Sequence, residues 1–418
     1  MSERIKAPRG TFDVLPEQQS VRLRIAETAR ALLEEAGYGR LDTPVFEETE
    51  LFARGVGESS EVVQKQMFSF EDQGGRGLTL RPEGTASVCR AYIEHGMQKR
   101  PQPVKLWYSG PFFRHERPQA GRYRQFHQVG AEAIGSASPL VDAELIVLVW
   151  DLVSELGVEG VKLTLGSLGS PSSRAAYLDE LRAYMHGRED ELSPEVRERI
   201  ELNPLRAFDS ADEGTQAVMA EAPRLLDRLD AEDAEHLEKV RALLDRTGVP
   251  YEVDATLVRG LDYYTRTVFE LHCERLGAQS QVGGGGRYDG LIEQLGGPAT
   301  PANGWAVGID RLALAMGEAE EPPRVDVFIV AEPEARERAL TLAIELRRAG
   351  ISADLDMAER SHRGQMKQAD RSGARHAVML GAEGVRVRDM TSGETADAEL
   401  SDLVDRLRNA LASGGGDA

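Results

Sequence analysis

Two segments of the chain carry cations, carboxylates and aromatic rings at spacings that suit a binding site for small charged molecules. The first, Pro111–Glu132, alternates as two strands do, with a turn expected at Pro118–Gly121. Because side chains alternate between the faces of a strand, Phe112, Arg114 and Glu116 share one face. Such a face is a poor hydrophobic core, and it suits a zwitterion and a phosphate. The matching face of the second strand carries Phe126, Gln128, Gly130 and Glu132.

The second segment is RGLDYY, from Arg259 to Tyr264, which adds a cation and two aromatic rings. Arginine is always charged, and its planar fork fits carboxylate and phosphate groups. Most arginines are simply solvated, but Arg259 is followed by a glycine and two rings, so we expect it in one site with Arg114 and Arg311. Adjacent Tyr263 and Tyr264 point to opposite sides if extended, so that one lines the site and the other packs beneath it.

Glu83 and Glu132 are the carboxylates that we expect to bind parts of a small molecule. Glu83 stands in Arg81–Thr85, just before a helix expected to begin near Ala86, and with Thr85 it suits an ammonium group. The alternative is an N-capping turn with Thr85 as the cap. A carboxylate such as Glu132 can orient an imidazole ring and fix its protonation state. The alternative for Glu132 is a buried ion pair with an arginine.

Four consecutive glycines, Gly283–Gly286, allow the backbone to approach a ligand closely. They do not present the GxGxxG spacing of a dinucleotide-binding turn, which argues against a Rossmann oxidoreductase. The chain also contains no GxxxxGK[ST] phosphate loop. A nucleotide would therefore have to be held by an antiparallel sheet.

Taken together, these segments resemble the histidyl-tRNA synthetases, a family of class II aminoacyl-tRNA synthetases. FRHERPQAGRYRQFHQ is similar to class II motif 2, RGLDYY and GGGGRYDG to the two histidine signatures, and GWAVGIDRL to motif 3. The resemblance covers nearly the whole chain. It implies an α+β catalytic domain built on an antiparallel sheet, in which ATP and L-histidine form histidyl-adenylate and pyrophosphate. Histidine then passes to the 3′ end of tRNA(His).

The resemblance also implies roles for individual residues. Arg114 is expected to grip the α-phosphate of ATP and Arg311 the γ-phosphate, while Arg259 bridges the histidine carboxylate and the α-phosphate. Mg²⁺ is expected because pyrophosphate leaves, with Glu116 as a weak candidate ligand. ATP is expected to contact Arg114, Glu116, Phe126 and Arg311. Histidine is expected to contact Glu83, Gly84, Thr85, Arg114, Gln128, Glu132, Arg259, Tyr263 and Tyr264.

The N-terminal region combines a helix and a strand. Apolar residues recur at three- and four-residue spacing from Glu17 to Ala36, which predicts an amphipathic helix. A strand is expected at Leu41–Phe46, at an edge or a bulge because of Pro44. The pair resembles class II motif 1, which implies a homodimer interface; the alternative is an ordinary helix–strand unit. A further strand is expected at Tyr251–Val258.

Composition shifts predict three parts of the chain. Residues 1–320 form the catalytic domain, with an acidic helical insertion at about 172–248. The polar stretch Gly317–Pro323 precedes a C-terminal domain at residues 323–412. Its strands alternate with helices, which predicts an α/β domain with a largely parallel sheet. By resemblance it binds the anticodon arm, and residues 413–418 are a disordered tail.

The C-terminal domain contains basic residues at spacings of three, four and four. On a helix this spacing aligns them along one face, which suits an RNA backbone. A solvated helix face is the alternative. The four residues are Arg360, Arg363, Lys367 and Arg371.

Net charge, cysteine content and the length of apolar runs limit the classes of function further. The net charge of −20 argues against nucleic acid taken alone, but a binding face needs only a local patch. The two cysteines form no CxxC pair, and no apolar run is long enough for a membrane span, so a cytoplasmic protein is expected. The alternatives are a histidine-sensing regulatory paralogue, which would lack the C-terminal domain or the ATP-gripping arginines, and a class II synthetase for another amino acid.

Overall fold

The computed structural model describes residues 4–57, 60, 62–317, 325–382 and 384–413. The chain forms two compact units that divide near residue 318, and each unit has hydrophobic clusters of its own. Most of the expected boundary at Gly317–Pro323 and of the expected tail lies outside the described residues. No described helix is long and apolar enough to cross a membrane.

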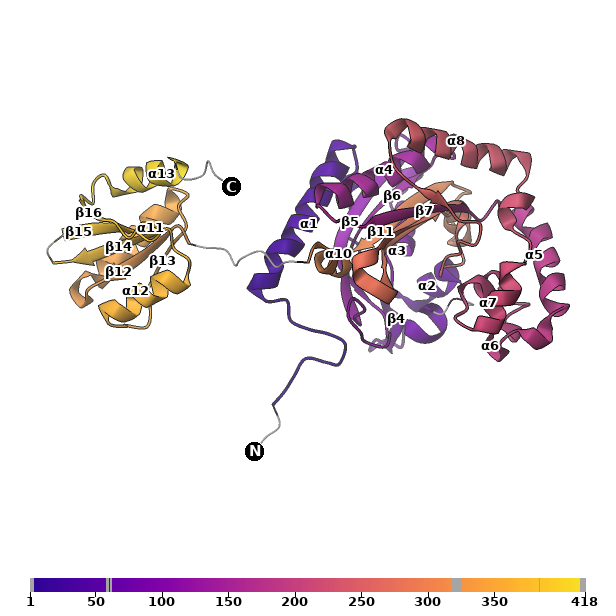
Figure 1. Ribbon diagram of the computed structural model, residues 1–418, viewed down its shortest axis with the longest axis horizontal. Helices are drawn as coiled ribbons and strands as arrows, with labels where there is room; N and C mark the ends of the chain where they lie inside the picture. The colour runs from indigo at the N-terminus through magenta and orange to yellow at the C-terminus, as the bar shows by residue number, and fades with distance from the viewer. Residues whose placement is uncertain (1–3, 58–59, 61, 318–324, 383, 414–418) are drawn as a thin grey trace. The chain divides into compact units, whose positions relative to one another are not determined.

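The larger unit is built on an eight-stranded sheet with the order β1-β5-β6-β11-β10-β9-β7-β8 (Figure 1). All neighbours pair antiparallel except the two outermost pairs, β1 with β5 and β7 with β8. The predicted antiparallel sheet is therefore confirmed. The strands are β1 Gly39–Arg40, β5 Val104–Phe113, β6 Gln125–Ile134, β7 Val161–Ser167, β8 Glu252–Val253, β9 Thr265–Cys273, β10 Gln281–Arg287 and β11 Ala302–Gly308.

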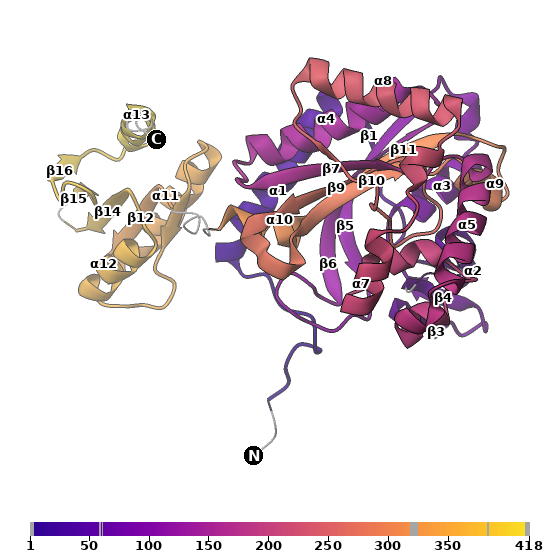
Figure 2. The same ribbon diagram turned by 45° about the vertical axis from the view of Figure 1, so that its right-hand side comes forward.

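The two faces of this sheet differ in chemistry because strand residues alternate. On β6, Val129, Ala131 and Ala133 face a large apolar cluster. That cluster is completed by helices on one side of the sheet (Figure 2). The residues between them, such as Gln128 and Glu132, therefore point to the opposite face. The covering helices are α1 Pro16–Glu35, α4 Pro139–Glu155, α8 Ala231–Thr247 and α10 Ile309–Met316.

The opposite face of the sheet packs against α3 Thr85–Glu94 and the short helix α9 Leu291–Gln294. The segment from residue 171 to residue 247 is mostly helical, as the pattern predicted. Its helices begin at side-chain caps that accept a backbone N–H, and Pro171 and Pro194 occupy first-turn positions. Besides α8, the helices here are α5 Pro171–His186, α6 Pro194–Arg197 and α7 Glu213–Ala220.

Two strand predictions in this unit were wrong. Leu41–Phe46 is irregular except at its end, where a small sheet of order β2-β4-β3 begins. Proline has no backbone N–H to donate to a ladder, which explains the break at Pro44. Tyr251–Val258 keeps only β8, because the Asp254 carboxylate accepts the Thr256 backbone N–H at 2.7 Å and turns the chain. The small sheet contains β2 Phe46–Glu48, β3 Phe68–Glu71 and β4 Gly77–Leu80, and α2 Thr49–Val56 follows β2.

The C-terminal unit is a five-stranded sheet of order β13-β12-β14-β15-β16 with helices on both faces. The expectation of a largely parallel sheet was wrong. β12 pairs parallel with β13 and β14, but β14–β15 and β15–β16 are antiparallel, because two residues between β14 and β15 permit only a hairpin. The elements are β12 Val327–Ala331, α11 Arg336–Arg348, β13 Ala353–Leu355, α12 His362–Arg371, β14 His376–Gly381, β15 Gly384–Asp389, β16 Thr395–Ala398 and α13 Leu403–Ser413.

Candidate active site

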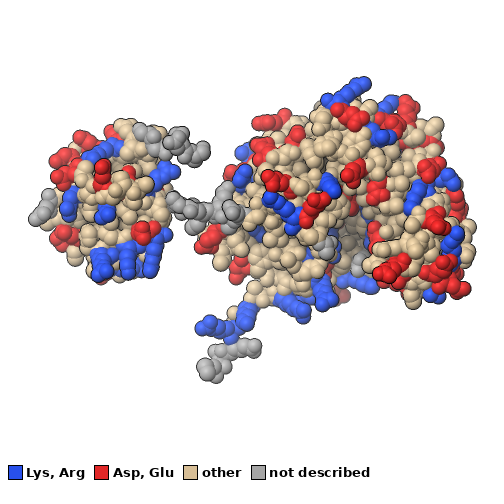
Figure 3. Space-filling model, viewed as in Figure 1, with Lys and Arg blue, Asp and Glu red and all other residues tan. Residues whose placement is uncertain are grey.

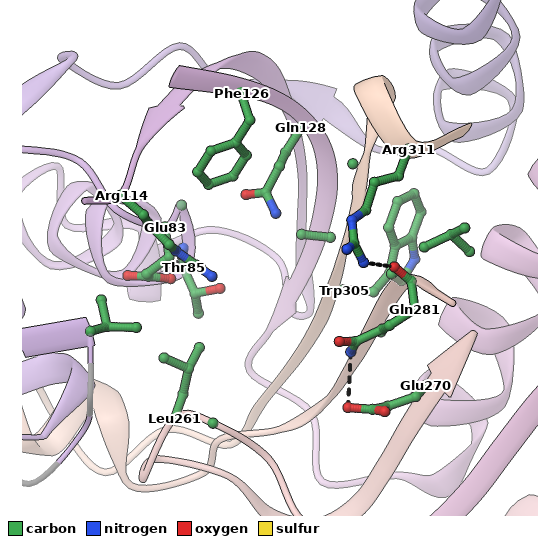
Figure 4. A pocket seen from close by; sticks show the side chains of 18 of the residues that line it. Glu83, Thr85, Arg114, Phe126, Gln128, Leu261, Glu270, Gln281, Trp305 and Arg311 are labelled. Carbon is green, nitrogen blue, oxygen red and sulfur yellow. Dashed lines mark hydrogen bonds between the residues drawn. The ribbon is translucent and has the colours of Figure 1, made fainter. Parts of the chain in front are cut away.

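A polar cavity of about 270 Å³ lies over the middle strands of the large sheet. Its wall comes from the β5–β6 hairpin, the start of α3, the loop at residues 259–264, and strands β9 to β11 with the first turn of α10 (Figure 4). Segments far apart in sequence thus meet in one place. The predicted residues that line it are Glu83, Gly84, Thr85, Arg114, Glu116, Phe126, Gln128, Arg259, Tyr263, Tyr264 and Arg311.

Glu132 lies beneath the cavity wall and is completely buried. Its carboxylate accepts hydrogen bonds from the hydroxyls of Thr85 at 2.8 Å, Tyr288 at 2.5 Å and Tyr108 at 3.4 Å. Burial raises the pKa of Glu132 to about 8, although these hydrogen bonds act in the opposite direction. Its partners in the described part of the chain are hydroxyl groups and not an arginine, so the ion-pair alternative is wrong.

Glycines make the space that Glu132 and its partners occupy. A Cβ at Gly304 would lie 1.6 Å from the Glu132 carboxylate oxygen Oε2. A Cβ at Gly84 or Gly130 would lie 2.4 Å from the ring of Tyr108. These positions need glycine because a neighbouring side chain fills the volume, and only the packed structure shows this.

Glu83 caps the helix that begins at Thr85. Its carboxylate accepts the backbone N–H groups of Thr85 at 2.7 Å and Ala86 at 2.9 Å. The interpretation of Thr85 as the cap was wrong, since the Thr85 hydroxyl donates to Glu132 instead. Burial raises the pKa of Glu83, while the two amides and the guanidinium of Arg114 oppose that shift.

Three arginines from separate parts of the chain reach the cavity. Arg114 donates through Nε to the Pro82 carbonyl at 2.9 Å, and its guanidinium lies 5.4 Å from the Phe126 ring centroid. Arg311 donates through Nε to the Gly121 carbonyl at 3.0 Å. Each arginine is thus aimed by a contact that leaves part of its fork for a ligand.

Arg259 forms an ion pair with Glu270, and its guanidinium lies 5.2 Å from the Tyr264 ring centroid. The rings of Tyr263 and Tyr264 are 4.8 Å apart. The expectation that these rings point apart was wrong, because β9 begins only at Thr265 and strand alternation does not apply before it.

Several buried polar atoms around the cavity lack a protein partner. Within the described ranges, these include Nε of Arg259, Nη2 of Arg311 and Oε1 of Gln128. Buried polar groups normally find a hydrogen-bond partner, so unpaired atoms in a cavity indicate a polar ligand. Two arginine nitrogens and one amide oxygen suit a ligand that carries both negative charge and N–H groups.

Sequence reasoning missed residues that hold the site together. Asp310 forms an ion pair with Arg22 of α1, and it accepts the His127 backbone N–H at 2.7 Å. Asp310 therefore ties α1 and β6 to the turn that carries Arg311. Its place beside Arg311 in the motif was a usable signal. Tyr288 stands in the GGGGRYDG segment, which was a similar signal. Glu270 and Tyr108 gave none, because each acts through a residue outside its own strand.

The carboxylates at the cavity are already engaged. Glu83 caps a helix, Glu116 lies 3.6 Å from Arg122, and Glu270 binds Arg259. In the described residues no group of three or more histidine, cysteine, aspartate or glutamate side chains could hold a metal ion. These residues therefore do not by themselves fit a magnesium site.

The basic residues of the C-terminal unit separate into two kinds. Arg363, Lys367 and Arg371 lie on α12, are exposed, and have no ion-pair partner in the described part of the chain. Arg360 was wrongly placed in this stripe: it precedes the N-cap residue Ser361 and pairs with Asp356 at 2.5 Å. Figure 3 shows Lys and Arg side chains gathered where α12 lies.

Comparison with known proteins agrees with this geometry. A family model of Histidyl-tRNA synthetase matches residues 10–312, and one of Anticodon binding domain matches residues 324–410. The histidine–tRNA ligase of Rubrobacter xylanophilus is 50% identical over 404 residues, which are 93% of this chain and 95% of the relative. That of Synechococcus elongatus is 48% identical over 408 residues, which are 96% and 94%.

Solved structures extend the comparison. The apo histidyl-tRNA synthetase of S. aureus has a TM-score of 0.82 at 40% identity, covering 97% of this chain and 100% of that one. A Bacillus halodurans chain described as an ATP phosphoribosyltransferase regulatory subunit/histidyl-tRNA synthetase has a TM-score of 0.66 at 25% identity, covering 88% and 97%. With family models spanning both units and relatives matched over nearly their full length, the chain belongs to the histidyl-tRNA synthetase family of ATP-dependent aminoacyl-tRNA ligases.

Proposed function

We propose that the cavity over the large sheet binds ATP and L-histidine side by side and joins them as histidyl-adenylate. The observation that carries this proposal is that Arg114, Arg259 and Arg311 line one polar cavity, with the buried carboxylate of Glu132 beneath its wall. A carboxylate oxygen of histidine attacks the α-phosphorus, the bond to the leaving oxygen breaks, and pyrophosphate departs. Histidine then passes to the terminal ribose of tRNA(His).

The first step needs alignment and charge stabilisation more than proton transfer. The histidine carboxylate is already ionised at neutral pH, so no general base is required. Arg114 and Arg259 stabilise the charge that grows on the α-phosphate, and Arg311 holds the γ-phosphate. The unpaired guanidinium nitrogens of Arg259 and Arg311 support these roles, because such donors are available to phosphate oxygens without reorganisation.

Histidine is recognised by groups at the start of α3 and on β6. In this proposal Glu83 and Thr85, with Gln128, take the α-amino group. Glu132 reads the imidazole, supported by the hydroxyls of Thr85 and Tyr288, whose hydrogen bonds it accepts. Tyr264 offers a ring face to the imidazole. A polar pocket of this kind rejects amino acids that leave its groups unpaired.

Mg²⁺ is proposed to enter with the phosphates of ATP, where it would stabilise the leaving pyrophosphate. The protein contributes the arginines around it. Glu116 remains the candidate contact from the motif 2 hairpin, although its arginine neighbours make it a weak ligand.

A homodimer is proposed from the resemblance to motif 1 and from the surface of the small sheet. Val45, Phe46 and Phe70 are exposed there, and the two phenylalanine rings lie 6.3 Å apart. Exposed apolar patches commonly mark protein interfaces. Analytical ultracentrifugation tests this proposal, and a monomer at micromolar concentration would contradict it.

Two other functions are separated by one experiment. A regulatory paralogue would bind histidine without activating it, and a synthetase for another amino acid would activate a different substrate. ATP–pyrophosphate exchange should be measured with each standard amino acid in turn. We expect exchange with histidine alone. Exchange with none would favour the regulator, and exchange with another amino acid would reassign the pocket.

A further inference from the structure

A carboxylate in the wall of a cavity that takes a triphosphate requires an explanation. Glu270 lies in the middle of β9, lines the cavity, and has a side chain that is 15% exposed. Like charges repel, and the repulsion grows as solvent is excluded. An unpaired Glu270 would therefore weaken the binding of ATP, which indicates that its charge serves another group.

The contacts of Glu270 identify that group. One carboxylate oxygen binds the guanidinium of Arg259 and accepts the Gln281 side-chain amide at 2.9 Å. The other lies 2.9 Å from Nε2 of His272. Burial by itself would raise the pKa of Glu270, but Arg259 and His272 hold it below its ordinary value, so the group is ionised at neutral pH.

Arg259 needs a partner of this kind because of where it lies. It belongs to the loop at residues 259–264, which no sheet ladder fixes, whereas Glu270 stands on a strand hydrogen-bonded on both sides. A functional side chain is held most accurately when a rigid element supports it. Glu270 supplies the support that the loop lacks.

The glycine run leaves room for the pair. Gly284 of β10 lies opposite Glu270 in the sheet register. A Cβ at Gly284 would lie 2.9 Å from Nη1 of Arg259. The backbone of Gly284 therefore lies close to the guanidinium of Arg259, and a side chain at this position would push the guanidinium away from Glu270. The Nε edge is left without a partner in the described residues.

Gln281 extends the same arrangement to a second cation. Its side-chain amide donates to Glu270, and its backbone carbonyl accepts a hydrogen bond from Arg311 (Figure 4). One residue of β10 thus contacts the support of Arg259 and also Arg311.

We propose that Glu270 is a positioning residue, which holds Arg259 with its free edge toward the reacting phosphate, and that Gln281 fixes Glu270. This inference rests on the proposed role of Arg259. In this role Glu270 acts through Arg259, by fixing the angle of the guanidinium.

The test begins with Glu270→Gln, which keeps the shape and removes the charge. ATP–pyrophosphate exchange should lose about 10–100-fold in kcat, with the KM for ATP within about threefold, because misplacing a catalytic group by about 1 Å costs on the order of 10²-fold. The matched control is Glu274→Gln, directly after the last residue of the same strand, whose exposed carboxylate pairs with Lys162 at 2.8 Å. The control should retain wild-type exchange. Equal losses in both variants would overturn the proposal.

The second arm separates positioning from other roles. In the Arg259→Ala background, Glu270→Gln should cause no further loss, because nothing remains to be positioned. Losses that multiply in the double variant would overturn the proposal, as would a Glu270→Gln enzyme whose only defect is a higher Mg²⁺ requirement. If Arg259→Ala alone leaves exchange unchanged, the proposed role of Arg259 fails. If Arg259→Ala is slow and Glu270→Gln is normal, only the positioning role fails. Thermal unfolding of each variant checks that the fold is retained.

Discussion

The arginines of the cavity and those of α12 show two ways of presenting positive charge. Arg259 and Arg311 are largely buried, and each is aimed by a contact from a different strand or turn. Arg363 and Lys367 project from a helix into solvent without a described ion-pair partner. The cavity arginines are preorganised for one ligand geometry, whereas the exposed basic side chains of α12 can adopt many geometries.

This difference determines how large a loss of activity or affinity we expect when each residue is replaced. A buried donor fixed toward developing charge acts in a medium that screens little, so its loss is large and specific to one step. An exposed cation acts through a phosphate backbone, and its contribution is small, roughly additive and strongly dependent on salt.

Replacement of Arg259 by alanine should have the largest effect. Removing a buried charge-assisted donor should raise the barrier to adenylate formation by about 3–4 kcal/mol, because the charge that it meets grows in the transition state. Histidine binding without ATP should change far less. Single-turnover kinetics measure the first quantity and calorimetry the second. A rate of adenylate formation within tenfold of wild type would contradict the larger role expected for buried arginines.

The pH dependence of stability should report the buried Glu132. Its pKa is raised from 4.5 to about 8, so the folded chain keeps a proton that the unfolded chain releases. The free energy of unfolding should therefore fall as the pH rises through this window, with a contribution of up to about 1.4 kcal/mol per pH unit. Urea unfolding from pH 5 to 8.5 measures it. Glu132→Gln should flatten the curve, and identical curves would place this carboxyl in water.

Histidine selectivity should depend on the same residue. Glutamine has an NH2 group, which only donates, in place of one carboxyl oxygen of Glu132, so the hydroxyl of Thr85 or Tyr288 would lose its acceptor. The KM for histidine should rise by a factor that corresponds to about 1–3 kcal/mol of lost binding free energy. The KM for ATP should be nearly unchanged. Equal losses for both substrates would assign Glu132 a structural role in the sheet.

Neutralising Arg363 and Lys367 together should have the smallest effect at any one salt concentration. The slope of log affinity for tRNA against log salt should fall by roughly 0.7–0.9 for each lost phosphate contact. Histidine activation without tRNA should be unchanged. The matched control is Arg360→Gln, because Arg360 is already paired with Asp356 and lies off the helix. An unchanged slope in the double variant would make α12 a solvated face.

The sequence alone determined the elements whose signal is local. The spacing of apolar residues gave α1, and the alternation on either side of Pro118–Gly121 gave the β5–β6 hairpin. The expectation that Arg114 and Glu116 share a strand face with Phe112 was wrong, because β5 ends at Phe113 and both residues lie in the connecting loop. Motif residues before α3, in the hairpin and in the RGLDYY segment line one cavity, although Glu132 lies beneath its wall. These signals depend on neighbours within one element, which a single chain displays directly.

The tertiary structure decided what depends on residues distant in sequence. Tyr288 donates to Glu132 across 156 positions, and a Cβ at Gly304 would collide with that carboxylate. The pairing of Glu270 with Arg259 joins a strand to a loop that no periodicity describes. Arg360 does not belong to the predicted stripe on α12, because the helix begins after its N-cap residue Ser361. Local spacing fixes which face a side chain occupies, but packing between segments fixes which partner it meets, because only the folded chain excludes water from that contact.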